Sequence, residues 1–140
     1  MKALICNEFG STKNLTLEEV KSPEPGAGQV LIDVHAAGIN FPDVLTVQGK
    51  YQFKPSLPFT PGIEVSGVIK KVGKDVKMRK VGDEVISTLQ TGAFASEVVT
   101  SENSTFLKGN MSFEQAAGFA LTSGTSYYAL KQRARLVAGE

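Results

Sequence analysis

VLIDVHAAGINFPDVLTVQGKY, residues 30–51, marks a change from an extended segment to a short helix. The β-branched residues of Val30–His35 predict a strand. Asn40 then suits a helix N-cap, Pro42 is tolerated in a first turn, and Asp43 favours the positive end of the helix. Two interpretations stay open. The residues cap a helix, or the Asn40 amide faces a pocket and offers a donor and an acceptor to a ligand.

Short strands, separated by glycine and proline, fill the first hundred residues. The predicted strands are Lys2–Asn7, Leu15–Val20, Val30–His35, Ile63–Val72, Glu84–Leu89 and Phe94–Thr100. From Ser112 the sequence predicts helices, with a break at Gly124 and a second helix beginning at Ser123 or Thr125. We therefore expect a mainly β fold with short helices, of the α+β class, that ends in a helical segment.

Composition narrows the classes of protein that this chain can belong to. Its 140 residues, 41% of them hydrophobic, are enough for one domain with a buried core. A formal net charge of +1 argues against a nucleic-acid binder. The single Cys6 favours a reducing, cytoplasmic location. No apolar stretch approaches the roughly 20 residues of a membrane-spanning helix.

Several segments could be taken for binding or catalytic motifs, but an ordinary structural role explains each of them better. Gly26-Ala27-Gly28 lacks the third glycine of a dinucleotide-binding turn and precedes a strand, and Gly67–Lys74 has the wrong spacing for a phosphate loop. His35 stands alone in a predicted strand, which favours an ordinary surface or packed histidine. The basic segment Lys70–Lys80 has no glycine-rich nest and favours a solvated turn.

Five segments together resemble the N-terminal, GroES-like domain of the medium-chain dehydrogenase/reductase superfamily. They are VLIDVHAAGINFPDVLTVQGKY (30–51), LPFTPGIEVSGVIKKVG (57–73), KVGDEVIS (80–87), GAFASEVVT (92–100) and SFEQAAGFALTSGTSYYAL (112–130). Their order and spacing resemble above all the zinc-free quinone oxidoreductase branch. This resemblance implies a partly open β-barrel and a reductase that uses NADPH to reduce quinones or activated alkenes.

The resemblance also implies, from two residues, whether this chain can bind the catalytic zinc ion of the zinc-dependent relatives. Zinc-dependent relatives place a cysteine where this chain has Asn40 and a histidine where it has Ile63. Asparagine is a weak neutral ligand and isoleucine offers none, so the catalytic zinc site cannot assemble here. A structural zinc lobe needs four cysteines, and this chain has only Cys6. We expect no metal site.

The resemblance assigns roles to residues on both sides of the reaction. On the acceptor side, Asn40 would lie beside the nicotinamide and the substrate, Asp43 would brace that turn, and Tyr51 with Phe53 would wall the substrate cavity. On the cofactor side, the expected contacts are Asn40, Thr125 and Tyr128. Glu64 would have a structural role. Leu45 stands where many quinone oxidoreductases carry a tyrosine, so no phenolic contact is expected there.

The resemblance further implies that the chain is part of a two-domain protein. Residues 1–124 would form the GroES-like substrate domain, and residues 125–140 would begin the linking helix to a Rossmann domain that binds most of the NADPH.

The alternatives are an enoyl-thioester reductase of the same superfamily and a non-catalytic binding or assembly module. Apolar surface near Tyr127, Tyr128 and Leu130 would promote a homodimer or other self-association, or leave the final helix partly disordered.

Overall fold

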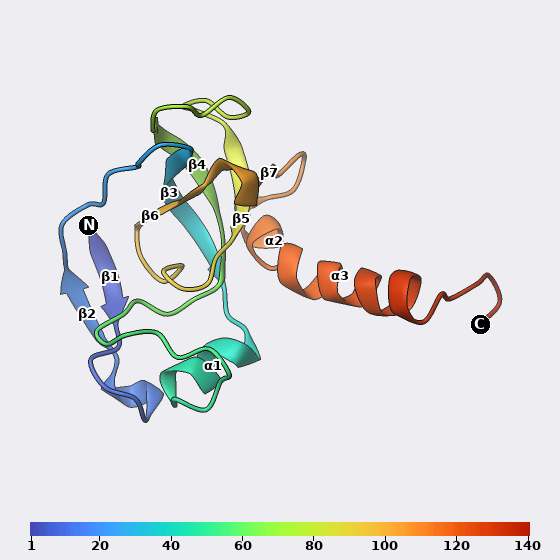
Figure 1. Ribbon diagram of the computed structural model, residues 1–140, viewed down its shortest axis with the longest axis horizontal. Helices are drawn as coiled ribbons and strands as arrows, with labels where there is room; N and C mark the ends of the chain where they lie inside the picture. Colours follow the sequence, from blue (N-terminus) through green and yellow to red (C-terminus); the bar gives the residue numbers. More distant parts are fainter.

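An antiparallel sheet of five strands forms the centre of the computed structural model, which describes residues 1–140 (Figure 1). Its strands follow the order β6-β3-β4-β5-β7. They span Gln29–Gly38 (β3), Glu64–Val72 (β4), Glu84–Thr88 (β5), Glu97–Ser101 (β6) and Thr105–Leu107 (β7). A two-stranded sheet of β1 (Lys2–Ile5) and β2 (Thr16–Glu19) lies beside it. The two sheets do not close into a barrel, in keeping with the expected mainly β, partly open architecture.

The hydrophobic core lies on the central strands of the five-stranded sheet. Val30 and Ile32 of β3 and Ile69 of β4 are fully buried, and they pack in one cluster. These residues lie on the same face because side chains alternate along a strand. The smaller sheet is attached through isolated bridges, of which one pairs Cys6 with Phe59. Burial of these apolar residues holds the sheet as a fixed platform for the segments at its ends.

Three α-helices complete the fold: α1 (Phe41–Val47), α2 (Phe113–Ala117) and α3 (Ala120–Tyr127). Helix α2 packs against β3 and β4, whereas α3 projects away from the sheets and buries none of its residues (Figure 1). A π-helical turn over Tyr128–Arg133 extends α3. Two 3-10 turns occupy Thr12–Asn14 and Glu102–Ser104. No helix is both long and apolar enough to cross a membrane.

The predicted helix break at Gly124 is wrong, because the break lies at Gly118. Helix α2 ends there, and Gly124 lies inside α3. A glycine in an exposed helix costs only about 1 kcal/mol relative to alanine, which a neighbouring contact can offset. That contact is the hydrogen bond of 3.0 Å from the backbone N–H of Leu121 to the Glu64 carboxylate. It fixes the start of α3 several residues before the predicted position.

The six predicted strands are confirmed within a few residues at their ends. The largest shifts, of three residues, are at the end of β3, which reaches Gly38 instead of His35, and at the start of β6, which begins at Glu97 instead of Phe94. The N–H groups of Phe94 and Ser96 donate to Pro61 and Lys2, outside the main ladder. Strand β7 was missed because its three residues are too few for an alternating pattern.

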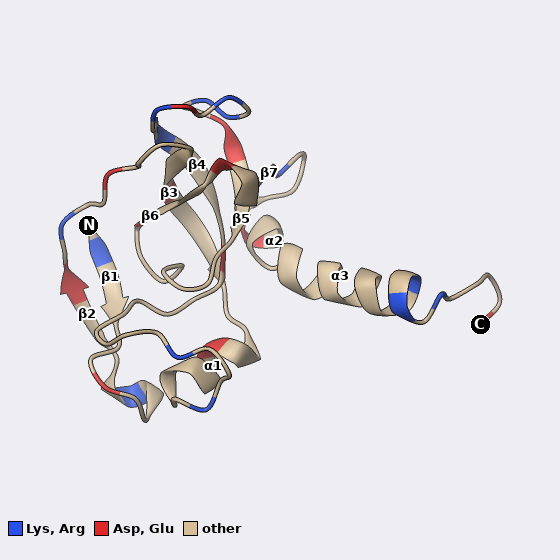
Figure 2. Cartoon of the chain, in the orientation of Figure 1, with Lys and Arg blue, Asp and Glu red and all other residues tan.

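The basic segment Lys70–Lys80 covers the last residues of β4 and most of the turn between β4 and β5 (Figure 2). The buried Glu102 carboxylate accepts hydrogen bonds from the backbone N–H groups of Lys77 and Met78. Lys70 pairs with Glu97, so part of the positive charge is already engaged. The expected solvated turn is confirmed. The exposed His35 stacks on the ring of Phe113, with 4.2 Å between the ring centroids.

Candidate functional site

The N-terminus of α1 forms at the point where β3 leaves the sheet. Asn40 has an extended backbone, with φ −123° and ψ 154°, and occupies the N-cap position. Its backbone N–H donates a hydrogen bond of 2.7 Å to Oδ2 of Asp43, and Pro42 occupies the first turn. These local contacts confirm the helix-cap interpretation. The backbone of Asn40 is therefore held in one conformation, which also fixes where its side chain begins.

The side-chain amide of Asn40 contacts a buried acid. Its Nδ2 donates a hydrogen bond of 2.9 Å to Oε1 of Glu64, which is only 1% exposed. The second oxygen, Oε2, accepts the hydrogen bond from the backbone N–H of Leu121. One carboxylate thus connects α1, β4 and the first turn of α3. This is the structural role expected for Glu64.

Asp43 lies in apolar surroundings close to this acid. It is 3% exposed and borders a cavity of about 220 Å³ with the side chains of Val44, Val47 and Phe94. Oδ1 of Asp43 has no hydrogen-bond partner. Burial raises the pKa of Asp43 above its usual value; the hydrogen bond from Asn40 opposes this, and the nearby Glu64 charge adds to it. The α1 turn therefore holds a carboxyl group that is protonated more readily than an exposed aspartate.

Gly38 allows these parts to approach one another. A Cβ atom at this position would lie 2.4 Å from Oε1 of Glu64 and 2.6 Å from the carbonyl oxygen of Ala117. Cβ atoms essentially never approach a non-bonded heavy atom to less than 3.0 Å. The end of β3 consequently needs glycine so that α2 and Glu64 can both reach it.

The side chains of Asn40 and Ile63, at the positions where the zinc-dependent enzymes that the sequence resembles carry cysteine and histidine, do not fit a zinc ion. The side chain of Ile63 has no ligand atom, and its carbonyl oxygen accepts the backbone N–H of Leu89 at 2.8 Å. The amide nitrogen of Asn40 is directed to Glu64. Nowhere in the chain do three or more His, Cys, Asp and Glu side chains gather as a possible metal site.

The other predicted site residues lie in two different places. Tyr51 and Phe53 follow α1, where the backbone N–H of Tyr51 donates to the carbonyl of Leu45 at 3.2 Å, and Phe53 is 40% exposed. Neither side chain borders the cavity beside Asp43. Thr125 and Tyr128 lie on α3 and its extension, both exposed. They follow Leu121 by four and seven residues, so they share its face of the helix.

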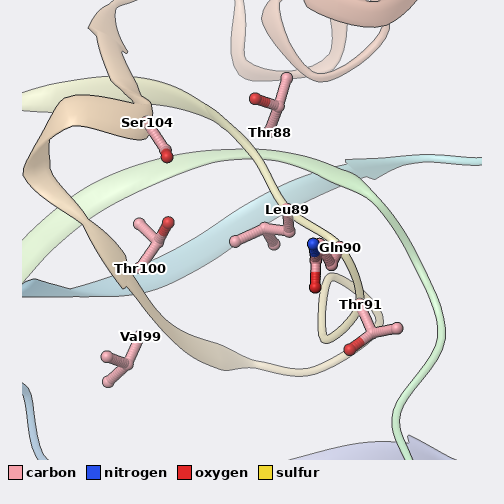
Figure 3. A pocket seen from close by; sticks show the side chains of 7 residues that line it. All are labelled: Thr88, Leu89, Gln90, Thr91, Val99, Thr100 and Ser104. Carbon is pink, nitrogen blue, oxygen red and sulfur yellow. The ribbon is translucent and has the colours of Figure 1, made fainter. Parts of the chain in front are cut away.

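A second cavity was not expected from the sequence. It has a volume of about 430 Å³ and lies where β5 ends (Figure 3). It is lined by Thr88, Leu89, Gln90, Thr91, Val99, Thr100 and Ser104. These residues come from two segments that are separated along the chain and share no motif, so only the fold brings them together. The one sequence signal is the density of hydroxyl and amide side chains in each segment.

This cavity adjoins the residues around Asn40 through the sheet. Thr88 pairs with Glu64 across the β4–β5 ladder, and residues directly opposite in an antiparallel pair lie on the same face. The next residue, Leu89, donates to the carbonyl of Ile63. The α1 N-terminus, the start of α3 and the cavity therefore lie around one end of β4.

Comparison with known proteins shows the family to which this chain belongs. Residues 26–138 match the family model described as the alcohol dehydrogenase GroES-like domain. A quinone oxidoreductase-like protein 2 homolog of Nematostella vectensis is 42% identical over 142 residues, which is 99% of this chain and 38% of that protein. The chain thus spans less than half the length of this relative.

Two solved structures share the fold closely. Human synaptic vesicle membrane protein VAT-1 homolog-like protein has a TM-score of 0.96 and 34% identity, over 99% of this chain and 45% of that one. Escherichia coli quinone oxidoreductase complexed with NADPH has a TM-score of 0.87 and 29% identity, over 96% and 41% of the two chains. The chain belongs to the alcohol dehydrogenase GroES-like domain family, in the quinone oxidoreductase-like branch of the medium-chain dehydrogenase/reductases.

Proposed function

We propose that this chain is the acceptor-binding domain of an NADPH-dependent reductase that acts on quinones or activated alkenes. The observation that carries the proposal is the fixed Asn40 amide at the meeting point of α1, β4 and α3. The quinone oxidoreductase relatives support the substrate class, and the structure of one of them with NADPH supports the cofactor.

The reaction proposed here needs no zinc. When bound, NADPH would supply a hydride to the conjugated acceptor, and a proton from water would complete the reduction. The protein then contributes by holding the acceptor in place and limiting water around it. The donor set supports this view, because Ile63 offers no ligand atom and the amide oxygen of Asn40 is a weak, neutral ligand.

Each proposed site residue has a separate task. Asn40 presents its amide oxygen beside the nicotinamide and the acceptor, and Asp43 fixes the backbone from which that side chain extends. Tyr51 and Phe53 contribute aromatic surface to the acceptor side. Thr125 and Tyr128 offer exposed hydroxyl groups on one face of the helix that begins at Leu121, where they contact the cofactor.

The larger part of the cofactor contact lies outside these 140 residues. The relatives are more than twice as long as the part that this chain matches. We propose that a Rossmann domain follows residue 140 in the full-length protein, that residues 125–140 form the link to it, and that the complete enzyme works in the cytoplasm. The isolated chain should therefore hold NADPH weakly and show negligible turnover.

The test compares the full-length protein with the 140-residue chain. NADPH oxidation is followed by the absorbance of the reduced nicotinamide, with 1,2-naphthoquinone as the acceptor and a metal chelator present throughout. The full-length protein should turn over and the short chain should not. Asn40→Ala should lower kcat/KM at least tenfold, whereas the exposed Asn110→Ala should leave it unchanged. Activity that requires added zinc, or an absence of activity in the full-length protein, would refute the proposal.

A further inference from the structure

The cavity at the end of β5 has walls with an unusual chemical character. Five of its seven lining residues carry a hydroxyl or an amide, and none carries a charge. Figure 3 shows Thr100 and Ser104 on one side, Gln90 and Thr91 on the other, and the apolar Leu89 between them. The volume of about 430 Å³ lies in the range of small-molecule sites, which is roughly 300–1,000 Å³.

Hydrogen bonds hold the backbone of both walls in place without a ligand. On one side, the backbone N–H of Leu89 donates to the carbonyl of Ile63, and that of Gly92 donates to the carbonyl of Thr60, each at 2.8 Å. On the other side, the hydroxyl of Ser87 donates to the carbonyl of Ser104 at 3.0 Å. A preformed site loses less conformational entropy on binding than a mobile one.

The polar side chains at the mouth are available to a ligand. The amide of Gln90 and the hydroxyls of Thr91 and Ser104 make no hydrogen bond with the rest of the chain. Hydroxyl groups can donate and accept, and an amide offers both kinds of atom, so oxygens of either carbonyl or hydroxyl type are matched. No charged side chain lines the cavity, so an ionic ligand would gain no ion pair there.

We propose that this cavity is a binding site for a neutral, ring-sized molecule that carries carbonyl or hydroxyl oxygens around an apolar body. The ring lies against Leu89 and Val99, and its oxygens reach Gln90, Thr91 and Ser104. This inference goes beyond the proposed function, because binding here involves no hydride transfer and needs no cofactor. It can hold whether or not the protein is a reductase.

The test uses the 140-residue chain labelled with ¹⁵N and a probe that cannot act as a conjugated electron acceptor. 1,4-Cyclohexanedione, which is saturated, is titrated while backbone amide shifts are followed. Saturable shifts should centre on residues 88–92 and 99–104. Cyclohexanecarboxylate and cyclohexylammonium, which have the same ring size but carry a charge, should give no saturable shifts there at equal concentration.

Two variants test the wall itself. Gln90→Leu and Thr91→Val remove polar groups with little change in size, and each should weaken binding about fivefold, as expected for one hydrogen bond. Thr16→Val, on the exposed strand β2, is the matched control and should bind as the unmodified chain does. Amide spectra show directly whether each variant is folded. Shifts spread over other surfaces, equal binding of the charged probes, or unchanged affinity in both folded variants would overturn the proposal.

Discussion

The side-chain amide of Asn40 donates a 2.9 Å hydrogen bond to the buried carboxylate of Glu64, which lies 24 residues further along the chain. Because the same carboxylate also accepts the backbone N–H of Leu121, the position of Asn40 depends on the position of α3. A change in one of these elements is therefore transmitted to the other through a single side chain.

Replacing Glu64 by glutamine should destabilise the chain even though the shape is preserved. The carboxylate accepts two hydrogen bonds with two different oxygens, whereas glutamine has one oxygen and an NH₂ group that must face one of the donors. Leaving a buried donor unsatisfied costs about 1–3 kcal/mol. The free energy of unfolding, measured with urea, should fall by that amount, and the Leu121 amide should exchange with solvent faster.

The matched control for this change is Glu19→Gln on the exposed strand β2. It removes the same charge without touching a buried donor, so the free energy of unfolding should change little. An equal loss of stability in both variants would show that the Glu64 contacts have no special importance.

Asp43→Asn should change how stability depends on pH. The pKa of Asp43 is raised in the folded protein above its usual value of 3.8, chiefly by burial. The folded state therefore binds more protons than the unfolded state between these two pKa values, and the wild type loses stability as the pH rises through that window. The variant has no such titration. The difference in the free energy of unfolding, variant minus wild type, should increase as the pH rises from 3.5 and then level off.

Urea unfolding of both proteins at several pH values measures that difference. Other acids titrate in the same range, among them Glu97, whose pKa is lowered chiefly by its hydrogen bond from Lys70. Asp43 is not among the groups that shift the pKa of Glu97, so this titration affects the two proteins alike and cancels in the difference. A difference that is constant with pH would show that Asp43 titrates as it does in the unfolded chain.

Patterns of neighbouring residues predicted most strands and the α1 cap. They did not predict which distant residues meet at the candidate site. Strands and the α1 cap depend on neighbouring residues, such as Asn40 and Asp43, and the sequence shows them directly. The start of α3 depends on Glu64, which lies 57 residues before Leu121. A prediction based only on the position of Gly124 therefore put the helix break in the wrong place. The cavity near Gln90 depends on the pairing of distant strands. No spacing rule along the chain contains that information.

Gly38→Ala should destabilise the protein because the added methyl group has no room. Its Cβ would meet Oε1 of Glu64 and the carbonyl oxygen of Ala117 at distances below 3 Å. Overpacking of this kind typically costs about 1–3 kcal/mol. Gly124→Ala is an informative control, because nothing lies within 4 Å of that position in α3. There alanine should raise the helix stability by up to about 1 kcal/mol. Thermal unfolding of both variants should show shifts of opposite sign, and equal shifts would contradict the packing argument.

The projecting helix should cause the isolated chain to self-associate. Helix α3 buries none of its residues; Tyr127 at its end and Leu130 in the π-helical extension are 62% and 50% exposed (Figure 1). Exposed large apolar side chains that lie close together favour association in water. Sedimentation velocity over a range of concentrations should show a dimer or larger species that increases with concentration.

Leu130→Lys should shift that equilibrium towards the monomer, because a charge buried in an apolar contact loses its hydration. Leu17→Lys is the matched control: Leu17 is 69% exposed, but it lies on β2, at the other side of the molecule from α3 (Figure 1). If association depends on α3, only Leu130→Lys weakens it. If both variants weaken it equally, general surface hydrophobicity is responsible, and a chain that stays monomeric at every concentration would show that the exposed helix face needs no partner.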